Sequence, residues 1–349
     1  MRVLFCGDKH LKINRFDLAK QCLSWLNGTI EQHKPDLYVC LGDDLDTHAV
    51  VRSEILTELR YHFDYVLSLG IPVVYVVGNH DCSRPNDMKY HALQSMIGLN
   101  PNLHIIDKPQ DLYGMTFVPY IHKPEDFPKQ TLPICVAHQT FKGADYGDIT
   151  TKDGVDASSI NGAEIIISGH IHKRHRLLTA KGTGSRGPEV VYIGSPFSQN
   201  ASDINQVKGV SIIDTETYAE EFITCPLPVW KGVKYELSPT FTAEEMHQEL
   251  METLNDKDHW VVEISGPKAE IIGYLGSKKG KSITVGRDVK IKTIFTDKEK
   301  KQVRIEATSL SSIISQYIDK VYNGSIDKDL LKSTAGQVLQ SLDNSTHLV

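Results

Sequence analysis

Val76-Val77-Gly78-Asn79-His80-Asp81 gives the clearest indication of how this chain folds. The segment closes an apolar run from Ile71 to Val77, which predicts a buried strand that stops at a glycine. Three side chains that can bind a metal or carry a proton follow at once. In α/β proteins the loops after the carboxyl ends of strands hold the functional groups. By itself the segment also fits an ordinary turn, because Gly, Asn and Asp all favour turns.

The composition is that of a globular chain with room for two domains: 349 residues, 40% hydrophobic and 23% charged. No apolar run is long enough to span a bilayer, so we expect no transmembrane helix and no membrane partner. The first residues run straight into a strand, without the features of a signal peptide. The six cysteines are widely spaced and form neither a disulfide framework nor a zinc motif. These features predict a reducing, cytoplasmic setting.

The charge is unevenly spread along the chain. The net charge of −6 argues against a free-standing nucleic-acid binder. From Lys268 to Arg304, however, eleven Lys and Arg stand against four Asp and Glu. This stretch is either a solvated charged face or a surface that meets phosphate groups.

The first part of the chain alternates strands with helices, which predicts βαβ units and a parallel sheet. The expected strands are Arg2 to Cys6, Leu37 to Leu41 and Ile71 to Val77. The expected helices are Phe16 to Gln32, Val50 to Leu69 and Met88 to Ile97.

The later strands have few helices between them, so we expect a second sheet packed on the first. They are Leu103 to Ile106, Met115 to Val118, Pro133 to Ala137, Glu164 to Ser168, Glu189 to Ile193 and Gly209 to Ile213. A small α+β module follows, with strands Tyr235 to Leu237, His259 to Ile264 and Lys290 to Phe295 and a helix Thr242 to Leu254. Apolar residues at helical spacing then predict two closing helices, Leu310 to Val321 and Leu331 to Leu342.

Five strand ends carry side chains of the kind that bind metals: Asp8 with His10, Asp43, Asn79 with His80, His138, and His170 with His172. A lone histidine is more often a packed or surface residue than a ligand, but five such coincidences in a row are improbable. Residues two apart on an extended segment point to the same side, so each of the two outer pairs can chelate one ion. Carboxylate, amide and imidazole ligands together suit Mn²⁺, Fe²⁺ or Zn²⁺ rather than a thiolate-bound structural zinc.

Seven candidate ligands are too many for one ion and suit two ions that share a bridging carboxylate. Asp43 is the natural bridge, because it stands alone between the paired groups. Two metals about 3.5–4 Å apart form the usual clamp for phosphoryl chemistry.

In order and spacing, these blocks resemble the five signature blocks of the calcineurin-like metallophosphoesterase superfamily: Gly7-Asp8-Lys9-His10, Gly42-Asp43, Gly78-Asn79-His80-Asp81, His138 and Gly169-His170-Ile171-His172. The resemblance implies an α/β protein with a four-layer α/β/β/α sandwich. It also implies one metal held by Asp8, His10, Asp43 and His172, and a second held by Asp43, Asn79, His138 and His170. His80 then stays free of metal and acts on the leaving group.

Within the superfamily the chain is most similar to the Mre11/SbcD nuclease subunits, especially the short phage type. Gly42-Asp43-Asp44-Leu45-Asp46 resembles their second block, and Tyr192-Ile193-Gly194-Ser195-Pro196 resembles the strand and turn after their His-x-His block. Leu45 replaces the usual aromatic residue, and Asp46 stands where some relatives carry a second catalytic histidine. The spacing of His48 does not assign it that role.

The resemblance also implies how the rest of the chain is organised. It places a nuclease domain at residues 1–228, a DNA-capping α+β domain at 229–297, and a linker with C-terminal helices at 298–349. The helix around Leu310 to Val321 resembles the one that grips a Rad50/SbcC-like coiled-coil ATPase, although a core-packed helix or an unrelated appendage could look the same.

The function implied is a DNA nuclease subunit that uses two divalent ions, Mn²⁺ or alternatively Mg²⁺. It would form a homodimer in the cytoplasm of a bacterium or a phage-infected host. His80 and Asp46 are the expected catalytic residues, with Asp46 and Asp81 holding imidazoles in the correct tautomer. Two other functions fit the same motifs: a phosphatase or cyclic-nucleotide phosphodiesterase for small molecules, and a non-catalytic scaffold.

Overall fold

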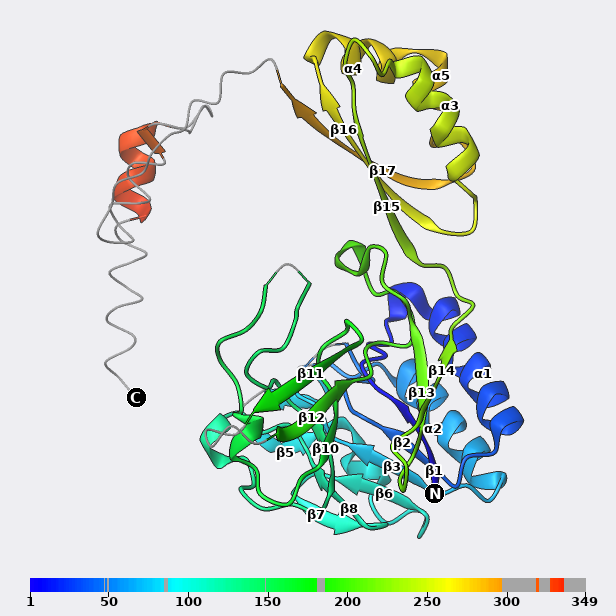
Figure 1. The fold of residues 1–349 in the computed structure, drawn as a ribbon, viewed down its shortest axis with the longest axis vertical. Helices are drawn as coiled ribbons and strands as arrows, with labels where there is room; N and C mark the ends of the chain where they lie inside the picture. Colours follow the sequence, from blue (N-terminus) through cyan, green and yellow to red (C-terminus); the bar gives the residue numbers. More distant parts are fainter. Residues whose placement is uncertain are drawn as a thin grey trace. The chain divides into compact units, whose positions relative to one another are not determined.

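Two six-stranded sheets form most of the structure, a computed structural model (Figure 1). It describes residues 1–296, apart from 47, 49, 85–86, 148 and 181–185, together with residues 318–319 and 327–335. The first sheet has the strand order β14-β13-β1-β2-β3-β6. Its parallel strands are β1 (Arg2–Cys6), β2 (Leu37–Cys40), β3 (Val73–Val76) and β6 (Leu103–Ile106); β13 (Gly209–Asp214) and β14 (Glu220–Thr224) extend it antiparallel.

The second sheet has the order β11-β12-β10-β9-β8-β7. Its parallel strands are β8 (Met115–Val118), β9 (Ile134–His138), β10 (Ile165–Gly169) and β12 (Arg186–Tyr192), with β7 (Gln110–Leu112) and β11 (His175–Ala180) antiparallel at the edges. The prediction of a second sheet is confirmed, as is the mixed α/β fold class.

The first sheet is buried on both faces, which is why its strands read as continuous apolar runs. Along β1, Val3 and Phe5 pack in the core between the two sheets, while Leu4 and Cys6 pack on the opposite face. That opposite face is covered by helices α1 (Phe16–His33) and α2 (Ser53–Ser68) (Figure 1). The alternation follows from the two-residue period of a strand.

The outer face of the second sheet is covered, in the described part of the chain, by loops and short 3₁₀ turns. Ala137, Ile166 and Val190 on the sheet pack there against Phe141 and Val155 from these loops. The helical layer of this domain therefore lies on the first sheet, while the second sheet carries a thinner cover.

The α+β module has a three-stranded sheet of β15 (Trp230–Glu236), β16 (His259–Gly266) and β17 (Asp288–Phe295), in that order. Its helices are α3 (Ala243–Thr253), α4 (Lys268–Gly276) and α5 (Lys278–Ser282). Helix α3 begins with a capping box in which Thr242 and Glu245 satisfy each other's main-chain N–H groups. The division of the chain at residues 228 and 297 remains a proposal.

The predicted helix from Met88 to Ile97 is wrong. The chain instead forms a hairpin of β4 (Cys82–Arg84) and β5 (Asp87–His91), followed by a 3₁₀ turn η2 (Ala92–Met96). His91 pairs with Cys82 across the hairpin, so this segment is extended, although its apolar residues recur at helical spacing. Only Leu93 and Met96 keep the helical spacing, and both are buried in the turn.

The predicted ATPase-binding helix from Leu310 to Val321 lies outside the described residues, apart from 318 and 319, which are helical. Residues 328–335 are also helical and belong to a second compact unit made of 266–268 and 295–349. Among the described helices, none combines the length and the apolar character that crossing a bilayer requires.

Candidate metal centre

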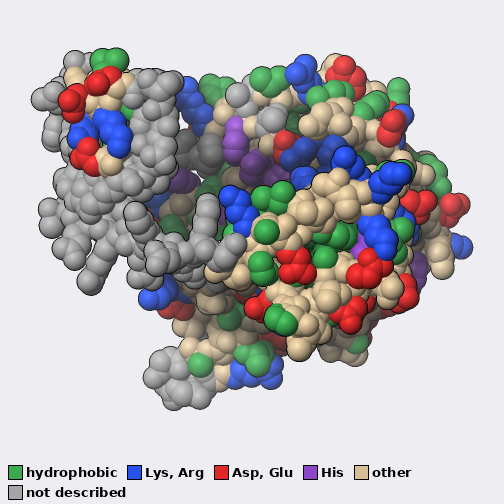
Figure 2. Space-filling model, turned by 90° about the horizontal axis from the view of Figure 1, so that it is seen from above, with side chains coloured by type: hydrophobic (Ala, Val, Ile, Leu, Met, Phe, Trp, Pro, Cys, Tyr) green, Lys and Arg blue, Asp and Glu red, His purple; other side chains and the backbone are tan. Residues whose placement is uncertain are grey.

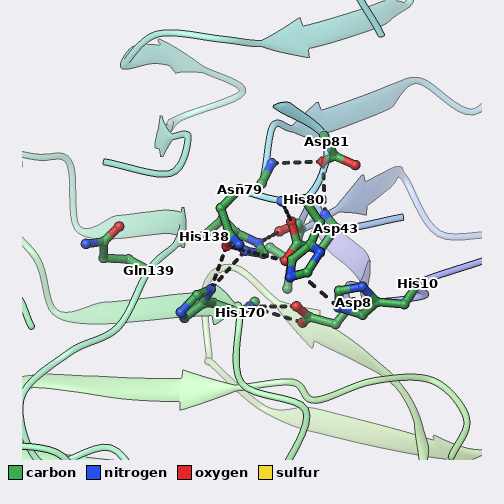
Figure 3. A network of polar contacts seen from close by, with 12 residues as sticks. Asp8, His10, Asp43, Asn79, His80, Asp81, His138, Gln139 and His170 are labelled. Atoms are coloured by element: carbon green, nitrogen blue, oxygen red, sulfur yellow. Dashed lines mark hydrogen bonds and ion pairs between the residues drawn. The ribbon is translucent and has the colours of Figure 1, made fainter. Parts of the chain in front are cut away.

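The carboxyl ends of strands from both sheets meet at one place and bring all eight motif side chains together. Figure 3 labels all of them except His172. Each of the five strands is parallel to a neighbour in its sheet, so their carboxyl ends lie at the same edge. The strands β1, β2, β3, β9 and β10 deliver, in that order, Asp8 and His10, Asp43, Asn79 and His80, His138, and His170 and His172. Figure 2 shows histidine side chains gathered on one face, beside Lys and Arg side chains.

One half of the cluster is centred on the Nε2 atom of His138. This atom lies 3.2 Å from Asp43 Oδ2, 3.2 Å from Asn79 Oδ1 and 3.2 Å from His170 Nδ1. The other ring nitrogen of His138, Nδ1, lies 2.6 Å from the main-chain oxygen of Leu41 and donates its hydrogen there. The tautomer is thereby fixed, and the Nε2 lone pair can face the cluster.

The other half of the cluster contains Asp8, His10 and His172, whose ligand atoms lie within 4.8 Å of one another. The Nε2 atoms of His10 and His172 are 3.0 Å apart, and His10 Nε2 lies 3.9 Å from Asp43 Oδ2. The carboxylate of Asp8 accepts the main-chain N–H of His170 at 2.9 and 3.1 Å, which ties the β1 loop to the β10 loop.

This donor set fits two divalent cations. Imidazole nitrogens and oxygen acceptors that face one another at about 3 Å repel unless a proton or a cation lies between them. Asp43 borders both halves, because its ligand atoms lie within 4.8 Å of those of His138 and His170 on one side and of those of His10 and His80 on the other. Carboxylate, amide and imidazole donors are the ligands that Mn²⁺ and similar ions accept.

Four of the motif residues adopt the left-handed backbone region that side chains other than glycine rarely enter. Their φ angles are 55° at Asp8, 40° at His10, 54° at Asp43 and 79° at His170. Such conformations cost about 1–3 kcal/mol each and persist where the surrounding structure imposes them. Their concentration in one cluster indicates a functional site.

Two glycines make the approach of the β2 and β3 loops possible. Gly42 itself has a φ of +91°. A Cβ atom at Gly78 would lie 2.2 Å from Asp43 Oδ1, closer than any side chain allows. The glycine that ends the β3 run is therefore required by the position of Asp43.

His80 lies beside the cluster with one ring nitrogen bound. Its Nδ1 donates to the main-chain oxygen of Asp46 at 3.0 Å, and its main-chain N–H donates to Asp43 Oδ1 at 2.7 Å. The ring meets His10 edge to face at 4.7 Å between centroids and stacks on His48 at 4.4 Å. The Nε2 atom is then the nitrogen available to a substrate.

The two expected supporting carboxylates differ in what they contact. Asp46 orients His80 through its main-chain oxygen, while its carboxylate lies 3.9 Å from His10 Nδ1 and 2.8 Å from Lys12 Nζ. The carboxylate of Asp81 accepts main-chain N–H groups of Gly78 at 2.9 Å and Asp43 at 3.0 Å. The prediction that Asp81 holds an imidazole is wrong, because its bonds fix the backbone that carries Asp43.

Burial and the charges of neighbouring groups determine which residues of the cluster hold a proton. Burial raises the pKa of Asp8 to about 7. For His138, burial alone would lower the pKa, but the Asp43 carboxylate raises it to about 9. Burial lowers the pKa of His170 to about 3, helped by the charge of His138. Burial would raise the pKa of Asp43, but His138 and neighbouring imidazoles bring it below its usual value. Without a cation, a proton on His138 therefore balances the charge of Asp43.

Two buried ion pairs under the cluster were not predicted. Lys9 donates to Asp44 at 2.6 Å with both side chains fully buried, and Lys9 is the residue between two candidate ligands. Lys208 donates to the main-chain oxygen of His172 and to Asp203, each at 2.8 Å. The position of Lys9 inside the first block was a possible sequence signal. Nothing in the sequence around Lys208 indicates its role.

Comparison with known proteins adds sequence relatives to this geometry. A model of the calcineurin-like phosphoesterase family matches residues 1–174. Exonuclease subunit 1 of Enterobacteria phage T4 is 25% identical over 244 residues, which cover 64% of this chain and 67% of the relative. The SbcD subunit of the nuclease SbcCD from Staphylococcus epidermidis is 24% identical over 257 residues, covering 62% and 66%. The chain thus spans about two thirds of the length of these relatives.

A solved structure, Pseudomonas putida nuclease MPE, matches with 15% identity and a TM-score of 0.31. The match covers 60% of this chain and 82% of that one.

Proposed function

Through residues 1–174 the chain belongs to the calcineurin-like phosphoesterase family, whose members use divalent metal ions, and on this premise we propose that it is a metal-dependent DNA nuclease. The observation that carries the proposal is the shared position of Asp43 between two groups of buried ligands. The names of two relatives, an exonuclease subunit and a nuclease subunit, support DNA as the substrate.

The proposed ligands divide between two ions. Asp8, His10, Asp43 and His172 would hold one, and Asp43, Asn79, His138 and His170 the other, with Mn²⁺ the favoured metal. When bound, such a pair supplies Lewis acidity toward a phosphodiester and toward the attacking water.

In the proposed reaction His80 protonates the leaving group. Water attacks phosphorus in line and releases a proton to the solvent, the bond from phosphorus to the departing oxygen breaks, and that oxygen takes up a proton. His80 in its imidazolium form gives the proton from Nε2, while Nδ1 stays bound to the Asp46 oxygen. The stacked His48 ring and the edge of His10 limit the rotation of the His80 ring.

We also propose that the α+β module binds the DNA backbone. Its helix α5 carries Lys278, Lys279 and Lys281, and β17 carries Lys290 and Lys292. Contacts from such side chains to phosphate groups give affinity with little sequence preference. This assignment supports residues 229–297 as a DNA-capping domain that follows a nuclease domain of residues 1–228.

The remaining proposal concerns partners. The word "subunit" in the names of both relatives supports a larger assembly. We assign residues 298–349 to the binding of a coiled-coil ATPase, through the segment around Leu310 to Val321, and we propose that the chain forms a homodimer. Pull-down with the full chain and with a form ending at Lys301 tests the ATPase assignment. Retrieval of the ATPase by both forms would contradict it, and a monomer in sedimentation would contradict the dimer.

The nuclease proposal is tested by incubating the purified chain with linear duplex and single-stranded DNA. Cleavage with Mn²⁺, loss of cleavage with a chelator, and loss in His80→Gln are expected. His104→Gln is the matched control, since His104 lies on β6 and contacts Tyr113 rather than the cluster. Hydrolysis of bis(4-nitrophenyl) phosphate without any cleavage of DNA would favour a small-molecule phosphodiesterase instead.

A further inference from the structure

A buried ammonium group lies under one half of the metal-ligand cluster. Lys208 is 2% exposed, and its Nζ atom lies within 2.9 Å of four oxygens. These oxygens belong to His172, Ser195, Asp203 and Gln206. Resting on the proposed two-metal centre, we propose that Lys208 is a positioning residue for one of the two ions, the one assigned to the half of the cluster that contains His172.

The strand order explains how Lys208 comes to lie at the cluster. Lys208 directly precedes β13, which runs antiparallel to β1 with Ser211 opposite Phe5. The start of β13 therefore lies beside the carboxyl end of β1, after which Asp8 and His10 follow. This position brings the lysine to the edge of the sheet at which the candidate ligands gather.

Lys208 and the turn after β12 hold the main chain of His172. The His172 oxygen accepts from Lys208 Nζ at 2.8 Å and from the main-chain N–H of Ser195 at 3.1 Å. Gly194 has a φ of +77°, and a Cβ atom there would lie 2.8 Å from the same oxygen. Because both donors are buried, the peptide group after His172 is fixed, which limits where its imidazole can point.

The same contacts continue to the loop after β1, which carries the other ligands of this half. The Asp203 carboxylate accepts from Lys208 at 2.8 Å on Oδ1 and from the main-chain N–H of Gln199 at 2.7 Å on Oδ2. The Gln199 side chain then donates to the main-chain oxygen of Lys9 at 2.8 Å. Lys9 stands between two candidate ligands, so one chain of buried bonds joins their loop to the loop of His172.

These contacts favour one half of the cluster. The bonds just described end at the main-chain oxygens of Lys9 and His172, which lie in the loops of that half. The other half is oriented by a different contact, the donation from His138 Nδ1 to the oxygen of Leu41. Groups that orient metal ligands typically change metal affinity by about 10–100-fold. Loss of Lys208 should therefore weaken the binding of one ion and spare the other.

An ammonium group suits this position because it has three N–H donors and no acceptor. The oxygens around it come from a main-chain carbonyl, a hydroxyl, a carboxylate and a side-chain amide. Methionine has a similar length but offers neither donors nor charge. Lys208→Met therefore has two effects, since it releases the His172 oxygen and leaves the buried Asp203 carboxylate without its partner.

The test measures the binding of Mn²⁺ to the full chain by titration calorimetry, with one half of the centre disabled at a time. In His170→Ala the remaining ion is the one held by His172, and adding Lys208→Met should raise its dissociation constant about 10–100-fold. In His172→Ala the remaining ion is the other one. There Lys208→Met should change the dissociation constant by about 2-fold or less, as expected for independent sites.

A second variant separates positioning from a loss of stability. Asp203→Asn added to Lys208→Met removes the unpaired charge and keeps an acceptor for the N–H of Gln199. In the His170→Ala background this combination should raise the melting temperature above that of Lys208→Met without restoring Mn²⁺ affinity. Lys231→Met is the matched control, because Lys231 pairs with Asp258 at 2.8 Å in the α+β module. It should change Mn²⁺ affinity by about 2-fold or less.

Three results would overturn the inference: unchanged Mn²⁺ affinity on adding Lys208→Met to His170→Ala, an equal loss of affinity in both backgrounds, or full recovery of affinity with Asp203→Asn. If the wild type binds two ions, these results refute the role of Lys208 and leave the proposed metal centre standing. A wild type that binds no Mn²⁺ would refute both. A selective loss of one ion in a chain that cleaves no DNA would refute the nuclease function and support the role of Lys208.

Discussion

The Nδ1 atom of His80 lies 3.0 Å from the main-chain oxygen of Asp46, an acceptor that no side-chain substitution removes. The bond fixes the ring orientation of His80 and holds a hydrogen on Nδ1, so that Nε2 is the nitrogen presented to a substrate. The orienting group of the proposed acid is therefore backbone, and the Asp46 carboxylate lies 2.8 Å from Lys12 Nζ and 3.9 Å from His10 Nδ1.

This arrangement predicts unequal effects at the two positions. His80→Gln should lower kcat for DNA cleavage by about 10²–10⁴-fold, because it removes the proton donor. Asp46→Asn should lower kcat by about 3-fold or less, because the main-chain oxygen remains. Single-turnover cleavage of an end-labelled oligonucleotide measures both. A loss in Asp46→Asn as large as in His80→Gln would show that the carboxylate itself takes part.

Uptake of metal should depend on pH, with affinity rising from about pH 6 to about pH 9. Without a cation, His138 has a pKa of about 9 and Asp8 a pKa of about 7, so both hold protons below these values. A protonated nitrogen or carboxyl cannot be a ligand, so binding must release those protons. Calorimetry of Mn²⁺ binding near neutral pH, in two buffers with different ionisation enthalpies, counts them. Binding without proton release, and with the same affinity across this range, would contradict the assignment.

The buried pair of Lys9 and Asp44 should contribute strongly to the stability of the metal-free protein. Burial alone would lower the pKa of Lys9, but the carboxylate of Asp44 raises it well above the usual value. Lys9→Met leaves that carboxylate buried without its partner, which should lower the free energy of unfolding by about 3–5 kcal/mol. Urea denaturation measures the change.

Two controls accompany this prediction. Lys9→Met combined with Asp44→Leu should lower the free energy of unfolding by less than the sum of the two single changes, since no unpaired charge remains. Lys20→Met breaks an exposed pair with Asp17 and should change the free energy of unfolding by about 0.5 kcal/mol or less. If Lys9→Met lowered the free energy of unfolding no more than Lys20→Met, the buried pair would not be needed for stability.

Gly78→Ala should disrupt the metal centre, because the added Cβ would lie 2.2 Å from Asp43 Oδ1. We expect a loss of bound Mn²⁺ in equilibrium dialysis, together with a lower melting temperature. Gly28→Ala is the control: Gly28 is exposed in α1, and a Cβ there meets nothing within 4 Å. It should raise the free energy of unfolding by about 0.5–1 kcal/mol through helix propensity. Normal binding of Mn²⁺ by Gly78→Ala would refute the steric argument.

The sequence was most informative where apolar runs end in polar side chains. The runs before Gly7, Gly42 and Gly78 became β1, β2 and β3, and the loops at their carboxyl ends became part of the cluster. At these three runs the spacing and composition of the apolar residues are enough to predict a strand, because a strand buried on both faces reads as a continuous apolar run. Strands β11 and β14 were not predicted. Each lies at a sheet edge and mixes half-buried with exposed positions, so neither reads as an apolar run.

The contacts that hold the site residues in place could not be predicted from the sequence. His80 is bound by a main-chain oxygen, and main-chain groups carry no residue-specific signal. Lys208 reaches the His172 loop across 36 residues, and Tyr120 meets His170 across 50 positions of sequence. Only the packing of the two sheets brings these segments together. The residues that bind were thus readable from the sequence, but the residues that hold them in place were not.

The most direct test of the account is anomalous diffraction at the manganese edge from crystals soaked in Mn²⁺. The account predicts two peaks about 3.5–4 Å apart, with the Asp43 carboxylate between them. His172→Ala should weaken one peak and His170→Ala the other, while Asp43→Ala should remove both. A single peak at saturating Mn²⁺, or two peaks that do not share Asp43, would contradict the central claim.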